Sequence, residues 1–257
     1  MTSPVLYVAH GDGSATITLN RPDRLNAISR PLIEGFIKAL ETARADASIR
    51  VVLLRAAGRA FCSGEDIIDL AENELSTDEM RLWSRRLQDI TRLMMFSDFH
   101  VVALAQGWVL GGGAAWPLNA DLALWADNAK MFLPEASYGL FVSGAMSFLL
   151  AERCGPERAR ALMLTGERAT IETLLHDRIA DRTVALADLE REGRATVDLL
   201  LALPPRSLIA YKRARIDQIR DQVERALDFE LLANMSGLAD PKLVGRLPAE
   251  IAVRTPD

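Results

Sequence analysis

Short apolar runs alternate with longer amphipathic stretches up to about residue 186. The short runs are bounded by turn residues and predict buried strands. In the longer stretches apolar side chains recur every three or four positions, as Leu32, Phe36 and Leu40 do, which is typical of helices packed on one face. Strands are predicted at 5–9, 15–19, 51–54, 100–105, 120–126 and 130–132, and helices at 31–45, 78–96, 145–152 and 157–165.

The last part of the chain has helical periodicity only. It predicts three helices, 189–203, 205–221 and 222–238, separated at Pro204-Pro205 and more weakly near Asp221. Alternating strands and helices favour the α/β class. We therefore expect a core over residues 1–187 and a helical region over 188–257, with polar loop sequence at 69–77 and a loose tail after Pro248.

Composition narrows the function classes. The chain has 257 residues, 49% of them hydrophobic and 25% charged, and a net charge of −5. This balance argues against binding to nucleic acid or to an anionic membrane. No apolar stretch has the length of a membrane span, and the first residues do not resemble a signal peptide. Two cysteines favour a cytoplasmic location, and no metal-binding motif is present.

A glycine-rich turn, residues 106–116, follows the apolar run 100–105. Gly111, Gly112 and Gly113 permit positive φ angles and leave backbone N–H groups open to a ligand. An apolar segment follows, and a helix there would direct its free N–H donors at the turn. The turn therefore suits a developing negative charge. It would equally suit a tight turn in which two backbones pack closely.

A second turn, residues 59–67, has the same design. It follows the apolar run 51–54 and contains Ser63, Gly64, Glu65 and Asp66 before a helix-like segment. Two such turns can supply two N–H donors to one oxygen, which is how an oxyanion hole is built.

Glu135 is the candidate acid–base group. It follows a short predicted strand and Pro134, and its sequence neighbours are apolar. Such surroundings raise the pKa of a carboxyl and suit proton transfer near neutral pH. The alternative is an exposed glutamate that caps a helix.

Other reactive side chains fit structural roles better. Cys62 has no histidine nearby in sequence and is best explained as a buried, inert thiol. Ser143-Gly144 lacks the first glycine of a nucleophile elbow. The basic run 211–215 is typical of a solvated helix face, and less often of a phosphate site.

Five motifs in register resemble the enoyl-CoA hydratase/isomerase (crotonase) family. The resemblance covers roughly residues 4–235 and rests on residues 20–27, 61–66, 107–113, 134–135 and 164–166. It implies a spiral of ββα units, with a C-terminal helical region that builds homotrimers or hexamers. It also implies an acyl-CoA substrate, in fatty acid metabolism for example, and no separate cofactor, because coenzyme A is part of the substrate.

The resemblance assigns roles to particular residues. The N–H groups of Glu65 and Gly112 would form the oxyanion hole for the thioester oxygen, with Glu135 as the proton shuttle. The CoA thioester would be held largely through the main chain, at Arg24, Leu25, Ser63, Gly64, Asp66 and Gly111.

One position departs from the hydratases of this family. They carry a second glutamate where this chain has Ala115, and a methyl group cannot activate water. A single glutamate can still move a proton between two carbons, so double-bond isomerisation of an enoyl-CoA is the predicted reaction. The alternatives are hydration or another lyase reaction with a replacement carboxylate, for which Asp69, Glu72 or Glu74 are candidates, and a non-catalytic relative that binds acyl-CoA or RNA.

Overall fold

The computed structural model describes residues 3–66 and 76–238, and two sheets organise them. The larger sheet has the order β1-β2-β3-β4-β6-β9. Its strands are β1 (Val5–Ala9), β2 (Ser14–Leu19), β3 (Val51–Ala56), β4 (His100–Ala105), β6 (Leu122–Ala126) and β9 (Arg182–Val184). The smaller sheet has the order β5-β7-β8, from β5 (Trp108–Leu110), β7 (Lys130–Phe132) and β8 (Ala169–Thr170).

The larger sheet is parallel except for the β1–β2 hairpin. Every residue of β4 is buried, which explains why this strand reads as a continuous apolar run. Alternate residues serve two cores. Val52 and Leu54 of β3 pack in the cluster that contains α1 (Arg30–Ala45), whereas Val51 and Leu53 pack against α8 (Leu189–Leu201).

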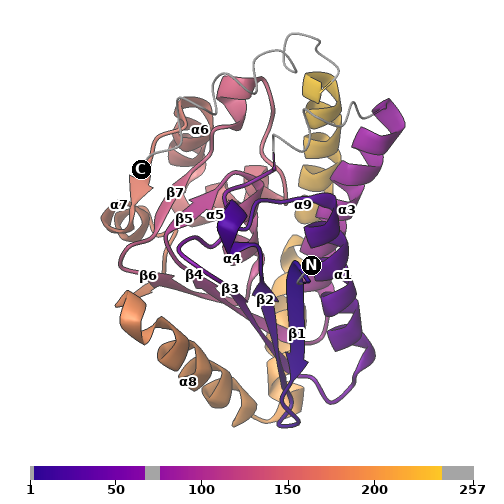
Figure 1. The fold of residues 1–257 in the computed structure, drawn as a ribbon, viewed down its shortest axis with the longest axis vertical. Coiled ribbons are helices and arrows are strands. Elements are labelled where there is room, and N and C mark those ends of the chain that lie inside the picture. Colours follow the sequence, from indigo (N-terminus) through magenta and orange to yellow (C-terminus); the bar gives the residue numbers. More distant parts are fainter. Residues whose placement is uncertain (1–2, 67–75, 239–257) are drawn as a thin grey trace.

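Helices cover both faces of this sheet. Figure 1 shows α8 along one face, with α1 and α3 (Thr77–Phe96) on the opposite side. The Ser76 side chain and Glu79 form a capping box at the start of α3, whereas Ser29, at the start of α1, makes no side-chain capping bond. The remaining helices are α4 (Gly112–Asn119), α5 (Met146–Cys154), α6 (Pro156–Thr165) and α7 (Ile171–His176), with short 3-10 turns η1 (Pro22–Arg24), η2 (Glu135–Tyr138) and η3 (Leu186–Asp188).

The C-terminal region corrects the sequence prediction. Pro205–Leu238 is one helix, α9, so the predicted break near Asp221 is wrong. Asp221 is polar but does not interrupt a helix, and neither proline nor glycine lies between Pro205 and Gly237. One face of α9 is continuous across this point and packs on α3 and α5 through Ile216, Ile219, Val223 and Leu227.

A buried cation anchors the first half of α9. Lys212 donates hydrogen bonds to the carbonyl oxygens of Met94 and Phe99 and to the carboxylate of Asp121, at 2.6–2.9 Å. Asp121 also accepts the N–H of Val101, at the start of β4. The predicted basic helix face therefore holds one lysine that is structural, since its charge is paired and its three donors are satisfied.

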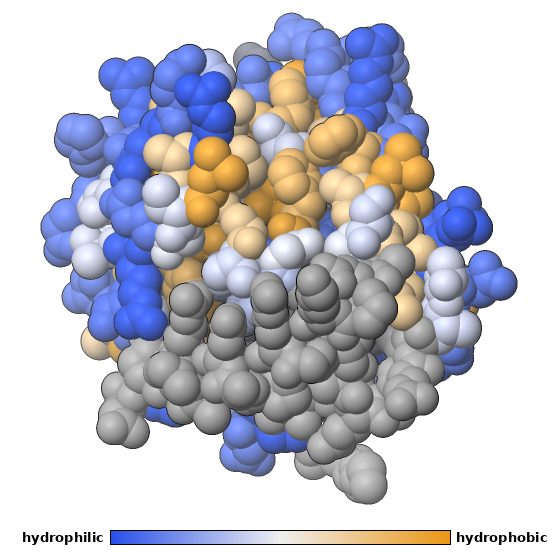
Figure 2. Space-filling model, turned by 90° about the horizontal axis from the view of Figure 1, so that it is seen from above, coloured by the Kyte–Doolittle hydropathy of each residue, from blue (hydrophilic) through white to orange (hydrophobic). Residues whose placement is uncertain are grey.

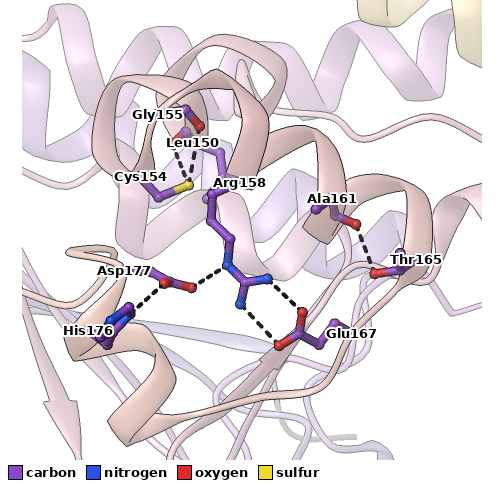
Figure 3. A network of polar contacts seen from close by, with 9 residues as sticks. All are labelled: Leu150, Cys154, Gly155, Arg158, Ala161, Thr165, Glu167, His176 and Asp177. Carbon is purple, nitrogen blue, oxygen red and sulfur yellow. Dashed lines mark hydrogen bonds and ion pairs between the residues drawn. The ribbon is translucent and has the colours of Figure 1, made fainter.

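An arginine network fixes the segment between α6 and α7. Arg158 pairs with Glu167 and with Asp177, which also contacts His176 (Figure 3). Gly166, just before Glu167, has φ +58°, and a Cβ atom there would lie 3.2 Å from the carbonyl oxygen of Leu133. The network thus holds the end of α6 against the strand that leads to residue 135.

The sequence prediction missed three short strands and one helix, namely β5, β8, β9 and α7. The predicted loop at 69–77 falls mostly, and the predicted tail wholly, outside the described residues. In the described ranges no helix combines the length and the apolar character that crossing a bilayer requires.

Candidate active site

The two glycine turns lie against each other. The N–H of Leu110 donates to the carbonyl oxygen of Cys62 at 2.9 Å, and the N–H of Cys62 donates to Trp108 at 3.1 Å. Gly64 has φ +81°, and a Cβ atom there would lie only 3.2 Å from the carbonyl oxygen of Leu110. Glycine is required at position 64 for both reasons: its backbone is left-handed and the neighbouring backbone approaches closely.

Gly112 begins α4, so its N–H has no acceptor within the helix. Gly111 precedes it with φ +50° and ψ −133°, which turns the chain sharply out of β5. At Gly113 a Cβ atom would collide with the Sγ of Cys62. The predicted inert thiol is therefore part of the packing that fixes this turn, and burial raises the pKa of Cys62 far above its usual range.

The backbone N–H of Glu65 points away from the neighbouring segment, which contains Ile28. Ile28 donates to the carbonyl oxygen of Gly64 at 2.8 Å and accepts the N–H of Asp66 at 2.9 Å. In extended chain, successive N–H groups point to opposite sides, so the N–H of Glu65 points away from Ile28. This leaves it available to a group on the other side.

The side chain of Glu65 lies at the same turn, which the sequence analysis did not foresee. Its Oε1 is 2.7 Å from the point where a Cβ atom of Gly112 would be, and its Oε2 is 3.6 Å from the corresponding point of Gly111. Burial raises the pKa of the Glu65 carboxyl, while hydrogen bonds from the backbone of Glu65 itself and of Gly112 act in the opposite direction. The carboxylate therefore lies beside the Gly111–Gly112 turn, next to the N–H groups that were predicted to form the oxyanion hole.

Glu135 faces this turn from the neighbouring strand of the same sheet, because it follows β7, which pairs with β5. It begins η2, its side chain is 7% exposed, and neither carboxylate oxygen has a hydrogen-bond partner in the described part of the chain. Its Oε1 lies 3.0 Å from the Cβ point of Gly111. Burial, and next the charge of Glu65, raise the pKa of Glu135 to about 8. The alternative of an exposed capping glutamate is wrong, because this carboxyl is buried and unpaired.

A third buried carboxylate comes from α9. Glu230 is 1% exposed and accepts hydrogen bonds from the N–H groups of Ala145 and Ser147 and from the Ser147 hydroxyl, at 2.7–2.9 Å. Burial raises its pKa to about 7, and its charge contributes to the raised pKa of Glu135. Glu230 was not among the predicted site residues, although this residue continues the buried face of Val223 and Leu227 at helical spacing.

Ala115 lies one turn into α4 and is buried. A Cβ atom at Gly144 would lie 2.5 Å from the Ala115 methyl group, so the segment around Gly144 packs directly on this position. Asn119 ties the two together by donating to the carbonyl oxygens of Ala115 and Gly144. The main chain at Gly144 therefore packs directly against Ala115, whose side chain is a methyl group.

The residues predicted to hold CoA border the second turn. The N–H of Ser63 donates to the carbonyl oxygen of Leu25 at 3.1 Å, and Leu25 is left-handed with φ +49°. Arg24 is exposed on η1, whereas the buried carboxylate of Asp66 pairs with Arg21 at 3.0 Å. The structure places Arg24, Leu25 and Ser63 together, and their contact with CoA remains a prediction. Among the described residues, no three His, Cys, Asp or Glu side chains are grouped as metal ligands would be.

Two main-chain turns with free N–H donors beside a buried carboxyl define a site suited to stabilising charge on a carbonyl oxygen and moving a proton next to it. Comparisons with known proteins identify the enzyme family. The family model for enoyl-CoA hydratase/isomerase matches residues 10–238. The chain therefore belongs to the enoyl-CoA hydratase/isomerase (crotonase) superfamily, and it is an acyl-CoA-processing enzyme of that family.

Individual relatives agree. The chain is 32% identical over 186 residues to a probable enoyl-CoA hydratase, echA6, of Mycobacterium tuberculosis, which covers 72% of this chain and 73% of that protein. It is 29% identical to carnitinyl-CoA dehydratase of Proteus mirabilis, over 76% and 74% of the two chains. A crystal structure of an enoyl-CoA hydratase/isomerase from Xanthobacter autotrophicus Py2 superposes with a TM-score of 0.88 at 27% identity, covering 100% of both chains. The predicted crotonase-like α/β fold is thus confirmed.

Proposed function

We propose that this protein forms the enolate of an enoyl-CoA thioester and that Glu135 moves the proton. One observation carries the proposal: the buried carboxyl of Glu135, which has no hydrogen-bond partner among the described residues, faces the Gly111–Gly112 turn. An unpaired buried carboxyl is costly to the fold, and such groups are concentrated at functional sites.

The chemistry follows from the two turns. The thioester oxygen would accept the N–H groups of Gly112 and Glu65, which hold the negative charge that develops as a proton leaves C2. Each such donor typically lowers the barrier by about 3–4 kcal/mol. Glu135 would take the proton from C2 and return it to C4, which converts a 3-enoyl-CoA into a 2-enoyl-CoA without loss or gain of atoms.

Double-bond isomerisation is the reaction that one carboxylate at position 135 can perform alone. Ala115 offers no group to orient water, and the main chain near Gly144 fills the space beside it. The thioester would reach the turns along Leu25 and Ser63, where exposed Arg24 is free to meet phosphate groups of CoA.

Hydration is the second candidate, favoured by the carboxylate of Glu65 at the same turn. It also agrees with the names of the relatives, which include hydratases and a dehydratase. The replacement carboxylates that the sequence suggested, Asp69, Glu72 and Glu74, lie outside the described residues.

Assembly into trimers or hexamers is a further part of the proposal. Phe229 and Leu232 of α9 are exposed, at 59% and 68%. On the face seen from above, apolar residues gather in the middle, with hydrophilic residues above them and on either side (Figure 2). Exposed apolar patches of this kind mark surfaces that bind partners or ligands. The cytoplasmic location remains a prediction.

Purified protein offered 2-enoyl-CoA and 3-enoyl-CoA separately tests the proposal. Products of unchanged mass with a shifted double bond indicate isomerisation, and a gain of one water indicates hydration. Tight CoA-ester binding with no change in either substrate would contradict the proposal and favour the non-catalytic alternative. Glu135→Gln should abolish turnover and keep CoA-ester binding within a few-fold.

A further inference from the structure

The carboxylate of Glu65 occupies the place that a substrate oxygen needs. Its Oε1 lies beside Gly112, close enough that even a methyl group at position 112 would displace it. The N–H groups of Gly112 and of Glu65 itself favour the charged form of this carboxylate. Two N–H donors cannot serve the carboxylate and a thioester oxygen at once, so a bound thioester must displace the side chain.

Rotation towards Gly111 would keep the displaced carboxylate of Glu65 in the site. Its Oε2 already faces the Cβ point of Gly111, which Oε1 of Glu135 approaches from the other side. Part of residue 65 remains exposed, although burial dominates the environment of its carboxyl. A small rotation towards Gly111 would leave the side chain next to Glu135.

The two carboxyl groups are unequal. Neighbouring carboxylates do not both ionise readily, because each charge disfavours the other. The backbone N–H groups of Gly112 and Glu65 favour the charged form of Glu65, although burial raises its pKa, whereas burial and the charge of Glu65 raise the pKa of Glu135 to about 8. Glu135 is therefore the carboxyl that holds a proton near neutral pH, and a carboxylate beside it supplies a base next to this acid.

We propose that Glu65 is a second catalytic carboxylate, which takes a proton from water as the water oxygen adds to C3 of a 2-enoyl-CoA. The proposal rests on the enolate chemistry proposed above, and of the two candidate reactions it selects hydration. It also explains how the site adds water although position 115 is alanine.

The step balances. The oxygen–C3 bond forms as one O–H bond of water breaks, and that proton goes to Glu65. The electron pair of the C2=C3 bond moves to the thioester oxygen as the enolate and then forms a C–H bond at C2 with the proton of Glu135. Solvent exchange afterwards removes the proton from Glu65 and returns one to Glu135. The sum is enoyl-CoA plus water giving 3-hydroxyacyl-CoA.

Glu65→Gln and Glu65→Ala test this, since both keep the backbone N–H of residue 65. Glu41→Gln is the matched control, because Glu41 is exposed on α1, away from the turns. Hydration of 2-enoyl-CoA by both Glu65 variants should fall about 100-fold or more in kcat, the usual effect of losing a general base. KM should stay the same or fall, because the carboxylate no longer competes for the N–H donors, and Glu41→Gln should match the wild type.

A kcat of either folded Glu65 variant within about three-fold of the wild type would overturn the proposal, since a carboxylate that only fills the empty hole affects KM alone. Wild-type protein that shifts the double bond but adds no water would also overturn it, and would leave the isomerase proposal standing. Turnover that persists in Glu135→Gln is the separate result that would remove the enolate proposal itself.

Discussion

Glu230 of α9 accepts two hydrogen bonds from Ser147, one from its N–H at 2.9 Å and one from its hydroxyl at 2.7 Å. These residues are 83 positions apart in the chain, so the pair fastens the C-terminal helix to the start of α5. Because Glu230 also influences the pKa of Glu135, the last helix belongs to the electrostatics of the site.

Replacement of Glu230 should therefore destabilise the protein. Glu230→Ala leaves the buried N–H of Ala145 and that of Ser147 without their acceptor, and each unsatisfied donor costs about 1–3 kcal/mol. Urea denaturation should show a loss of about 2–5 kcal/mol in the free energy of unfolding. Ser147→Ala, which removes only the hydroxyl bond, should lose about 1 kcal/mol. Equal stability of Glu230→Ala and the wild type would contradict the assigned contacts.

The pH dependence of kcat/KM should distinguish the two candidate reactions. Isomerisation of a 3-enoyl-CoA needs Glu135 as a base, so the rate should rise with pH through about 8, the raised pKa of that carboxyl. Hydration needs the protonated form, so its rate should fall through the same pH. A profile that is flat between pH 6 and about 9 for both substrates would show that residue 135 transfers no proton in the rate-limiting step.

Stability should fall as pH rises from about 4.5 to about 8. The folded-state pKa values of Glu135 and Glu230 are raised, to about 8 and about 7, above the ordinary glutamate value of 4.5. Between these values the folded state binds more protons than the unfolded state, so each group lowers the free energy of unfolding by up to about 1.4 kcal/mol per pH unit. Denaturation at pH 5.5 and pH 8 measures the slope, and Glu135→Gln should make it shallower. An unchanged slope in this variant would show that Glu135 is not buried as described.

A matched pair of substitutions isolates the N–H of Gly112. Gly112→Ala and Gly112→Pro both add a Cβ atom near the Glu65 carboxylate, but only proline removes the donor. Proline is tolerated at the first position of a helix, which Gly112 occupies. The proline variant should be slower in kcat than the alanine variant by about 10²–10³. Equal rates would exclude the Gly112 N–H from the oxyanion hole.

The sequence predicted those features that local pattern determines. The strand at 100–105 has its observed bounds because a fully buried parallel strand is apolar throughout. The helix at 31–45 begins only one residue early in the structure, since its buried face follows a strict period. The two glycine turns were identifiable because only glycine fits where backbone meets backbone, as it does at Gly64.

Features that depend on distant contacts were not predictable. The strands β8 and β9 have two and three residues and exist through pairing with β7 and β6. The motif predicted only a main-chain role for Glu65, because the direction of its side chain depends on the fold around Gly111. Glu230 lies almost a hundred residues from Glu135, so only the packing of α9 brings their charges together.

Cys62 fills the room that any side chain at position 113 would need, which makes the turn rigid before a substrate arrives. Residue 65, in contrast, would give its backbone N–H to the proposed chemistry whatever side chain it carries. One fold could consequently change its reaction through a single side-chain substitution, while the backbone N–H donors that stabilise the negative charge stay in place. In enzymes built this way, new reactions would arise first at such positions, where the backbone and the side chain have separate roles.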